Sequence, residues 1–256
     1  MNSFLAYMGG KSLLANKIIP KIPAHNCYVE VFAGAAWLLF KKDEASSEVE
    51  IINDINLDLI TLYRVIKHHL EEFIRYFKWV LVSRDEFYRF RAENPETLTD
   101  IQRSVRFYYL LKLGYAARIK DPSFSIATTA KPRLNLLRIE EELSAVHLRL
   151  SRVFIENSDY TKIFTRFDKP DTFFYVDPPY YGCEDYYGKD IFSRDDFEKL
   201  KQVLTGIKGK FILSINDVEY VRKLFKGFKI ETVQTSYSAG GANKKKKVNE
   251  LLIMNY

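Results

Sequence analysis

The fold is indicated by residues 28–40, which read YVEVFAGAAWLLF. The apolar, β-branched and aromatic start is typical of a buried strand, Gly34 permits a tight turn, and the remainder is typical of a helix. Residues 49–54, VEIIND, resemble a second buried strand that ends in Asp54. A glycine turn followed about 20 residues later by a carboxylate indicates a βαβ unit in which Asp54 binds ribose hydroxyls. The alternative is that Asp54 only caps the next helix.

The turn after this first strand lacks the full G-x-G-x-x-G pattern, so pyrophosphate binding is not supported. A nucleoside without phosphates fits better, and S-adenosylmethionine is such a nucleoside. Gly10-Lys11-Ser12 is similar to the end of a phosphate-binding G-x-x-x-x-G-K-S loop, but position 5 is Leu5 instead of glycine. An ATPase is therefore not favoured.

A second informative stretch is residues 173–180, FFYVDPPY. Its first four residues are typical of a buried strand, which the two prolines must end because they cannot donate to a ladder. In open α/β sheets, ligands bind at the carboxyl ends of strands. There, Asp177 and the Pro178 carbonyl can each accept one hydrogen of an exocyclic amine, and Tyr180 can stack on a base. The alternative is a simple turn formed by the proline pair.

In this order the motifs resemble those of the Dam-type DNA adenine-N6 methyltransferases, an S-adenosylmethionine-dependent family with a DPPY motif. The matching elements are Tyr7-Met8-Gly9-Gly10-Lys11, Phe32-Ala33-Gly34, Asn53-Asp54-Ile55, Asp177-Pro178-Pro179-Tyr180 and a strand at residues 211–216. One departure is Ala35-Ala36, where many members have a second glycine.

The resemblance implies a fold, a cofactor and a set of site residues. The fold is an α/β, doubly wound Rossmann-like methyltransferase sheet with an inserted, mainly helical target-recognition domain. The cofactor is S-adenosylmethionine, without a metal, and its implied binding residues are Tyr7, Lys11, Phe32, Gly34, Asp54 and Asp177. The implied catalytic residues are Asp177, Pro178 and Tyr180.

The hydrophobic periodicity along the chain predicts the same organisation. Strands are expected near residues 153–155, 173–176, 211–215, 229–235 and 248–254, and helices near 193–204 and 217–225. Further helices are expected at residues 57–80, after Ser83, at 99–119 and at 135–153. Taken with the resemblance, this organisation implies a catalytic, cofactor-binding domain of residues 1–56 and 153–256, and an inserted DNA target-recognition domain of residues 57–152.

The formal net charge is +6 and the isoelectric point is near 9.0, which favours an anionic partner. Residues 99–152 hold ten basic and five acidic side chains, and four consecutive lysines precede the last apolar strand. Such a lysine run is usually a solvated loop, but beside a nucleobase site it also suits phosphate contacts. The residues expected to bind DNA are Arg118, Lys131, Arg133, Lys244, Lys245, Lys246 and Lys247.

The remaining composition is typical of a cytoplasmic globular protein. The 256 residues are 47% hydrophobic, which suffices for a core, and we expect neither a signal peptide nor a membrane span. Cys27 and Cys183 form no C-x-x-C pair, and the four histidines lack metal-ligand spacing. We expect a monomer without metal or membrane attachment, in the reducing cytosol of a bacterial cell or a phage-infected host.

The predicted function is transfer of a methyl group from S-adenosylmethionine to the N6 amino group of adenine in double-stranded DNA, after the base has left the helix. The alternatives are the same chemistry on RNA adenine or cytosine N4, protein glutamine methylation, and a DNA-binding homologue without catalysis. Asp177 and the basic insertion argue against glutamine methylation. Residues 120–133 offer few long polar side chains that could distinguish bases, so we expect relaxed sequence recognition.

Overall fold

The computed structural model describes residues 1–5, 7, 11–126, 128–182, 192–238 and 245–256. Within them, seven strands form one sheet in the order β3-β2-β1-β4-β5-β7-β6. The strands are β1 (Cys27–Glu30), β2 (Val49–Asn53), β3 (Val153–Glu156), β4 (Thr172–Val176), β5 (Lys210–Asn216), β6 (Lys229–Ser238) and β7 (Lys245–Met254). β1 to β5 are parallel, and β7 runs antiparallel to both β5 and β6. The predicted doubly wound, mixed α/β sheet is confirmed.

The strand order reverses between β1 and β4. From β1 the chain builds outward through β2 to β3, and β4 then pairs with the other side of β1. Ligands of open α/β sheets bind where such a reversal leaves a crevice at the carboxyl ends of the strands. The carboxyl ends of β1 and β4 are therefore the place to look for a site.

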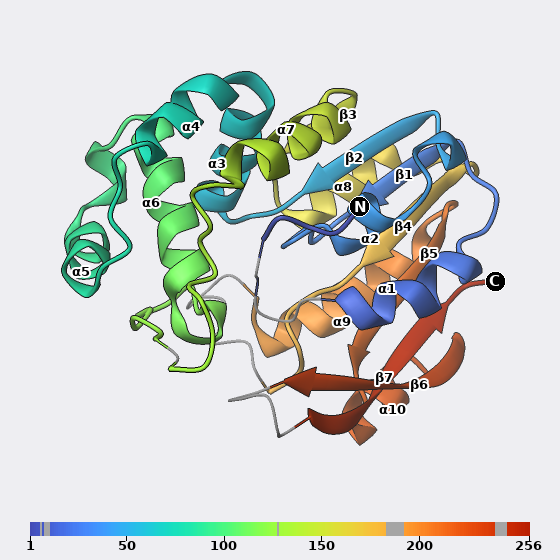
Figure 1. The fold of residues 1–256 in the computed structure, drawn as a ribbon. Coiled ribbons are helices and arrows are strands. Elements are labelled where there is room, and N and C mark those ends of the chain that lie inside the picture. Colours follow the sequence, from blue (N-terminus) through green and yellow to red (C-terminus); the bar gives the residue numbers. More distant parts are fainter. Residues whose placement is uncertain (6, 8–10, 127, 183–191, 239–244) are drawn as a thin grey trace.

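Alternating side chains along the strands supply two hydrophobic cores, one on each face of the sheet. Tyr28, Phe173 and Tyr175 pack in the core that also contains apolar residues of α1 (Ser12–Ile18), α2 (Trp37–Lys41) and α3 (Leu57–His68). Val29, Phe174 and Val176 point into the other core, beneath α8 (Tyr160–Phe167), α9 (Arg194–Gly206) and α10 (Glu219–Leu224). The sheet is thus covered on both faces (Figure 1).

The chain between β2 and β3 is mainly helical, as predicted. It forms α3, α4 (Leu70–Phe77), α5 (Arg84–Ala92), α6 (Asp100–Leu113) and α7 (Ile139–Leu150), and α3 to α6 lie on the side to which β1 and β2 point (Figure 1). Polar caps set the helix starts: Asn56, Ser83 and Thr99 each accept hydrogen bonds from the first turn that follows. The exact boundaries of two separate domains stay a prediction.

Several predicted helix limits were wrong. Residues 57–80 do not form one helix, because His69 leaves the helical region at φ −136° and separates α3 from α4. The third helix of the insertion ends at Leu113 rather than at residue 119, and the fourth begins at Ile139. Two helices of seven and eight residues, α1 and α8, were not predicted, since each is too short to show a periodic pattern.

Short 3-10 turns lie at Ile19–Lys21, Glu44–Ser46, Pro95–Thr97 and Tyr115–Ala117. In the described ranges, no helix is both long enough and apolar enough to span a bilayer.

A buried ionic cluster ties the insertion to the sheet. Arg149 of α7 donates two hydrogen bonds to Glu50 of β2, at 2.5 and 2.7 Å, and a third to the Leu39 carbonyl. Lys42 lies 2.6 Å from the same carboxylate. Arg149 and Glu50 are 5% and 7% exposed, so the loss of either partner leaves the other charge buried.

We expect Arg149→Ala to lower the free energy of unfolding by about 3 kcal/mol, because it removes one partner of a buried pair. Arg138→Ala is the matched control. Arg138 is the residue just before α7, and it pairs with Glu141 at the exposed surface. That change should cost less than about 1 kcal/mol. Urea unfolding of both variants measures the difference, and equal losses would contradict the anchoring role of Arg149.

Candidate active site

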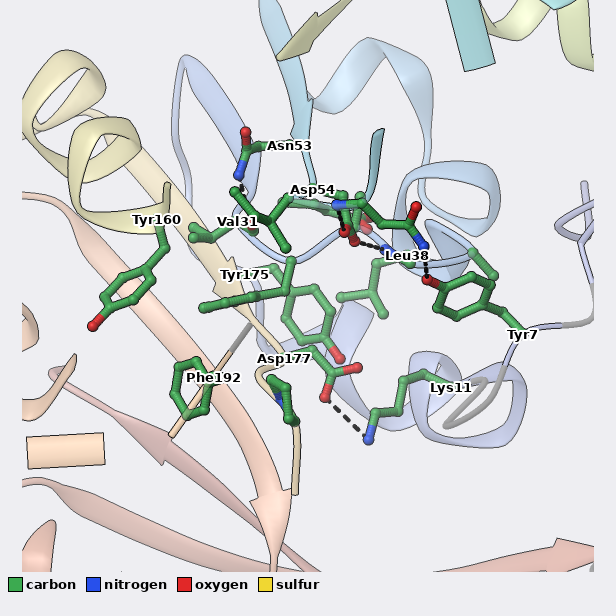
Figure 2. Close-up of a pocket in the computed structure, with 18 of the residues that line it drawn as sticks. Tyr7, Lys11, Val31, Leu38, Asn53, Asp54, Tyr160, Tyr175, Asp177 and Phe192 are labelled. Atoms are coloured by element: carbon green, nitrogen blue, oxygen red, sulfur yellow. Dashed lines mark hydrogen bonds and ion pairs between the residues drawn. The ribbon is translucent and has the colours of Figure 1, made fainter. Parts of the chain in front are cut away.

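A pocket opens at the carboxyl ends of β1, β2 and β4 (Figure 2). Tyr7, Phe32 and Tyr160 give it aromatic walls. Asp54 lies on one side of it and Asp177 with Lys11 on the other (Figure 2). The structure therefore brings together all six residues that were expected to bind a cofactor, the sixth being Gly34.

The turn after β1 depends on Gly34, which has a left-handed φ of +48°. Its N–H donates to Asp54 Oδ2 at 2.9 Å, and its carbonyl accepts from Tyr63 Oη at 2.8 Å. A Cβ atom at this position would lie 3.3 Å from the Tyr7 ring. Ala36, the second residue of the Ala35-Ala36 pair that replaces the second glycine of many members, is also left-handed, at φ 49°. The chain thus keeps the turn while accepting some strain.

Asp54 holds the turn from the end of β2. Its Oδ1 accepts the N–H of Asn56 at 2.9 Å, while Oδ2 accepts the N–H of Gly34. Burial raises the pKa of Asp54, and these backbone hydrogen bonds oppose that shift. The cap of α3 is Asn56, whose side chain accepts from the N–H groups of Asp58 and Leu59. The interpretation of Asp54 as the helix cap was therefore wrong.

Phe32 is fixed by neighbouring rings. Its centroid lies 5.5 Å from that of Tyr160 and 5.9 Å from that of Phe192, in tilted and edge-on arrangements. This aromatic cluster forms the pocket wall opposite Tyr7 (Figure 2).

Asp177 follows β4 directly, as the sequence predicts. Its Oδ1 accepts from Ser214 Oγ at 2.8 Å and lies 3.1 Å from Lys11 Nζ. Tyr175 Oη is 2.8 Å from the same serine oxygen. No described residue donates to Asp177 Oδ2 or to the Pro178 carbonyl. Two acceptors are therefore available, side by side in sequence, at the strand end.

Burial raises the pKa of Asp177 to about 6. The charge of Lys11 opposes this shift, and the negative charge of Glu250 adds to it. Lys11 is only 4% exposed and also lies 3.4 Å from Glu250 Oε2. Tyr180 Oη donates to Glu250 Oε1 at 2.5 Å and accepts from Lys11. Asp177 and Pro179 line the pocket, whereas Pro178 and Tyr180 do not. Tyr180 thus lies outside the pocket wall.

The basic residues expected to bind DNA are at the surface where the structure describes them. Arg118, Lys131 and Arg133 lie between α6 and α7, are exposed, and form no ion pair with described residues. Lys247 is exposed on β7. Lys245 and Lys246 pair through their backbones with Ser238 and Tyr237, so the lysine run enters the strand rather than staying in a loop. Lys244 lies outside the described residues, as do Met8, Gly9 and Gly10.

With this geometry in place, comparison with known sequences identifies the family. The family described as D12 class N6 adenine-specific DNA methyltransferase matches residues 7–239. The chain belongs to this family. Its reaction is methylation of the N6 amino group of adenine in DNA, as the sequence predicts.

Three relatives align along almost their whole lengths. Type II methyltransferase M.CviBI of Paramecium bursaria Chlorella virus NC1A is 24% identical, with 100% of both chains covered. The DNA adenine methylase of Escherichia coli (strain K12) is 26% identical over 98% of this chain and 94% of its own. Type II methyltransferase M.MjaIII of Methanocaldococcus jannaschii is 27% identical over 99% and 98%.

Four polar residues in and around this candidate site were not predicted as site residues: Glu30, Ser214, Asn216 and Glu250. Burial raises the pKa of Glu30 to about 7, and its carboxylate accepts from Tyr28 Oη and the Leu39 N–H. Asn216 Oδ1 accepts from the Tyr181 N–H, and its Nδ2 donates to the Tyr181 carbonyl. The sequence does carry a signal for Glu30 and Glu250, because each is a single acid within an apolar strand pattern.

We expect Gly34→Ala to destabilise the methyltransferase by about 1–2 kcal/mol, because alanine at a left-handed φ meets its own carbonyl. Crowding of Tyr7 adds to that loss. Gly227→Ala is the control, since a Cβ there meets no atom within 4 Å and the backbone is not left-handed. Chemical unfolding curves give both values. A Gly34→Ala protein as stable as the control would show that the turn does not require glycine.

Proposed function

We propose that the methyl donor is S-adenosylmethionine and that the pocket of Figure 2 holds it. Lys11 is the sole lysine or arginine among the described lining residues, and its ammonium is already paired with carboxylates. Such a lining suits a nucleoside without phosphates. Tyr7, Phe32, Gly34 and Asp54 would hold the nucleoside, with Asp54 offering carboxylate oxygens to the ribose hydroxyls. When bound, the cofactor supplies an electrophilic methyl group.

The observation that carries the mechanism is the pair of available acceptors after β4. Asp177 Oδ1 is held by Ser214 and Lys11, which leaves Oδ2 and the Pro178 carbonyl to accept the two hydrogens of an adenine amine. Accepting both hydrogens withdraws the nitrogen lone pair from the ring and makes the amine a better nucleophile. The same carboxylate can accept the proton that the amine must release. Catalysis is then mostly positioning.

The target base must leave the double helix, because its amino group is otherwise inaccessible to the pocket. Extrusion costs a few kcal/mol, and stacking on an aromatic ring returns about 1–3 kcal/mol. Tyr180 is next to the acceptors and outside the pocket wall, so its ring suits this stacking role.

We infer that residues 57–152 recognise double-stranded DNA and that the protein acts as a monomer in the cytoplasm. Arg118, Lys131, Arg133 and residues 244–247 would contact phosphates, which fix the register of the protein on DNA without reading its sequence. The first three are exposed and form no ion pair with any residue that the structure describes, which supports this role.

We expect Asp177→Ala to lower the rate of methyl transfer by about 10²–10³-fold or more, since it removes one preorganised partner of the amine. In the wild type, the rate should fall as the pH drops below about 6, because a protonated Asp177 loses acceptor capacity. Transfer of a labelled methyl group to DNA measures both effects.

Asp195→Ala serves as the control, because Asp195 is exposed on α9 and does not line the pocket. It should retain the wild-type rate and pH profile. More than half of the wild-type rate in a folded Asp177→Ala protein would rule out the assigned role of Asp177.

We expect relaxed recognition, extending to one or two bases beyond the target adenine, with affinity that falls steeply with salt. Arg133→Ala should weaken binding equally on all sequences and reduce the slope of log K against log salt by about 0.9 per lost phosphate contact. Lys226 is an exposed lysine after α10, and Lys226→Ala should leave that slope unchanged.

Methylation mapping tests the extent of sequence recognition. A strict site of four or more bases at excess enzyme would contradict relaxed recognition.

A further inference from the structure

Glu250 is a buried acid to which the mechanism above gives no role. It lies on β7, opposite Asn216 of β5, and is 1% exposed. Because β7 runs antiparallel to β5, this position comes near the carboxyl end of β5, beside the turn that holds Asp177. A carboxylate is costly to bury, so its partners decide what it does there.

Glu250 joins a group of four side chains that contact one another. Its Oε1 accepts from Tyr180 Oη at 2.5 Å, and its Oε2 lies 3.4 Å from Lys11 Nζ. Lys11 in turn donates to Tyr180 Oη and lies 3.1 Å from Asp177 Oδ1. The four residues come from the N-terminal segment, the turn after β4 and β7. One ammonium is thus shared by two carboxylates and a phenol.

We propose that Glu250 is a positioning residue for methyl transfer, which fixes the ring of Tyr180 and shares the Lys11 ammonium with Asp177. The inference rests on the proposed function of Tyr180 and Asp177. A phenol oxygen that both donates to a carboxylate and accepts from an ammonium cannot swing freely, so the ring presents one orientation to a base. An ammonium that also serves Glu250 neutralises Asp177 less than an exclusive partner would.

If Glu250 had only a structural role, different results would be expected. Its loss would lower the stability of the fold without changing the pH profile of the rate or the coupling between Glu250 and Tyr180. The groups that face Asp177 and enter its titration are Lys11, Glu30, Tyr175, Tyr180 and Glu250. Glu250 raises the pKa of Asp177, so removal of its charge alone should shift the acid limb of the rate profile to lower pH.

The test compares E250Q, Y180F and the double variant with the wild type. E250Q keeps the shape and an oxygen acceptor but removes the charge, while Y180F keeps the ring and removes the hydroxyl. We expect each single variant to lower kcat about tenfold, because the loss of one contact should misplace the ring by less than the 1 Å that costs on the order of 10²-fold. The double variant should lose no more than the worse single one, since both changes break one unit. Affinity for S-adenosylmethionine, measured by calorimetry, should change less than about twofold.

A readout independent of turnover is the fluorescence of 2-aminopurine placed at the target position in DNA. The wild type should raise it on binding, and Y180F and E250Q should alter the level reached, because the ring orientation against the base changes. E219Q is the matched control: Glu219 is an exposed glutamate paired with Lys223, and its change should affect neither kcat nor fluorescence.

The outcomes separate the two proposals. If the wild type transfers no methyl group to adenine, the proposed function fails. If the wild type is active but E250Q has the same kcat and the same acid limb of the rate profile as the wild type, the role of Glu250 is overturned. It is also overturned if the losses of the two single variants multiply in the double variant. Should E250Q not fold, as judged by circular dichroism, Y180F decides: a wild-type kcat and fluorescence level in Y180F also overturn the proposal.

Discussion

The pairing of β1 with β4 is the constraint on which the site depends. The two strands are far apart in sequence, yet Glu30 lies opposite Tyr175, and the Val31 N–H donates to the Tyr175 carbonyl at 3.0 Å. This register places the Gly34 turn and Asp177 next to each other, at the carboxyl ends of β1 and β4. A shift by one residue would turn each side chain to the opposite face, so the register is fixed by the two cores on either side. The methyltransferase site is in this sense a product of how the two faces are buried.

The same edge of the sheet carries a concentration of buried acid. Glu30 lines the same pocket as Asp177, and Asp177 and Glu250 lie beside Lys11. Burial raises the pKa of both Glu30 and Asp177. Each carboxylate nevertheless has specific donors, from Tyr28 and Leu39, from Ser214, and from Tyr180 respectively. Satisfied polar networks of this kind hold their members in one geometry, whereas an unpaired member would be costly. The network thus gives the Asp177 carboxylate a fixed direction at the cost of some stability.

The elements that the sequence predicted well are those with local signals. Buried strands, the glycine turn and the proline pair can each be recognised from a few consecutive residues, and the order of the motifs predicts the family. The break at His69 carries no glycine or proline to reveal it. The roles of Ser214, Asn216 and Glu250 depend on how β5 pairs with β4 and β7, which is a long-range property. A lone acid in an apolar strand indicates burial, but only the register shows which partner it meets.

The insertion presents Arg118 from a strained and constrained segment. Ala116, Ala117 and Asp121 all have left-handed φ values, which cost about 1–2 kcal/mol for a residue with a Cβ. The segment is closed by an antiparallel bridge between Gly114 and Phe124, whose ring packs on Phe87. Strain of this kind persists only where the surroundings enforce it, and it is concentrated at binding and switch regions. A flexible linker would not retain three such residues between positions 116 and 121. The phosphate contacts proposed for Arg118 therefore start from an ordered surface, which lowers the entropy that DNA binding must overcome.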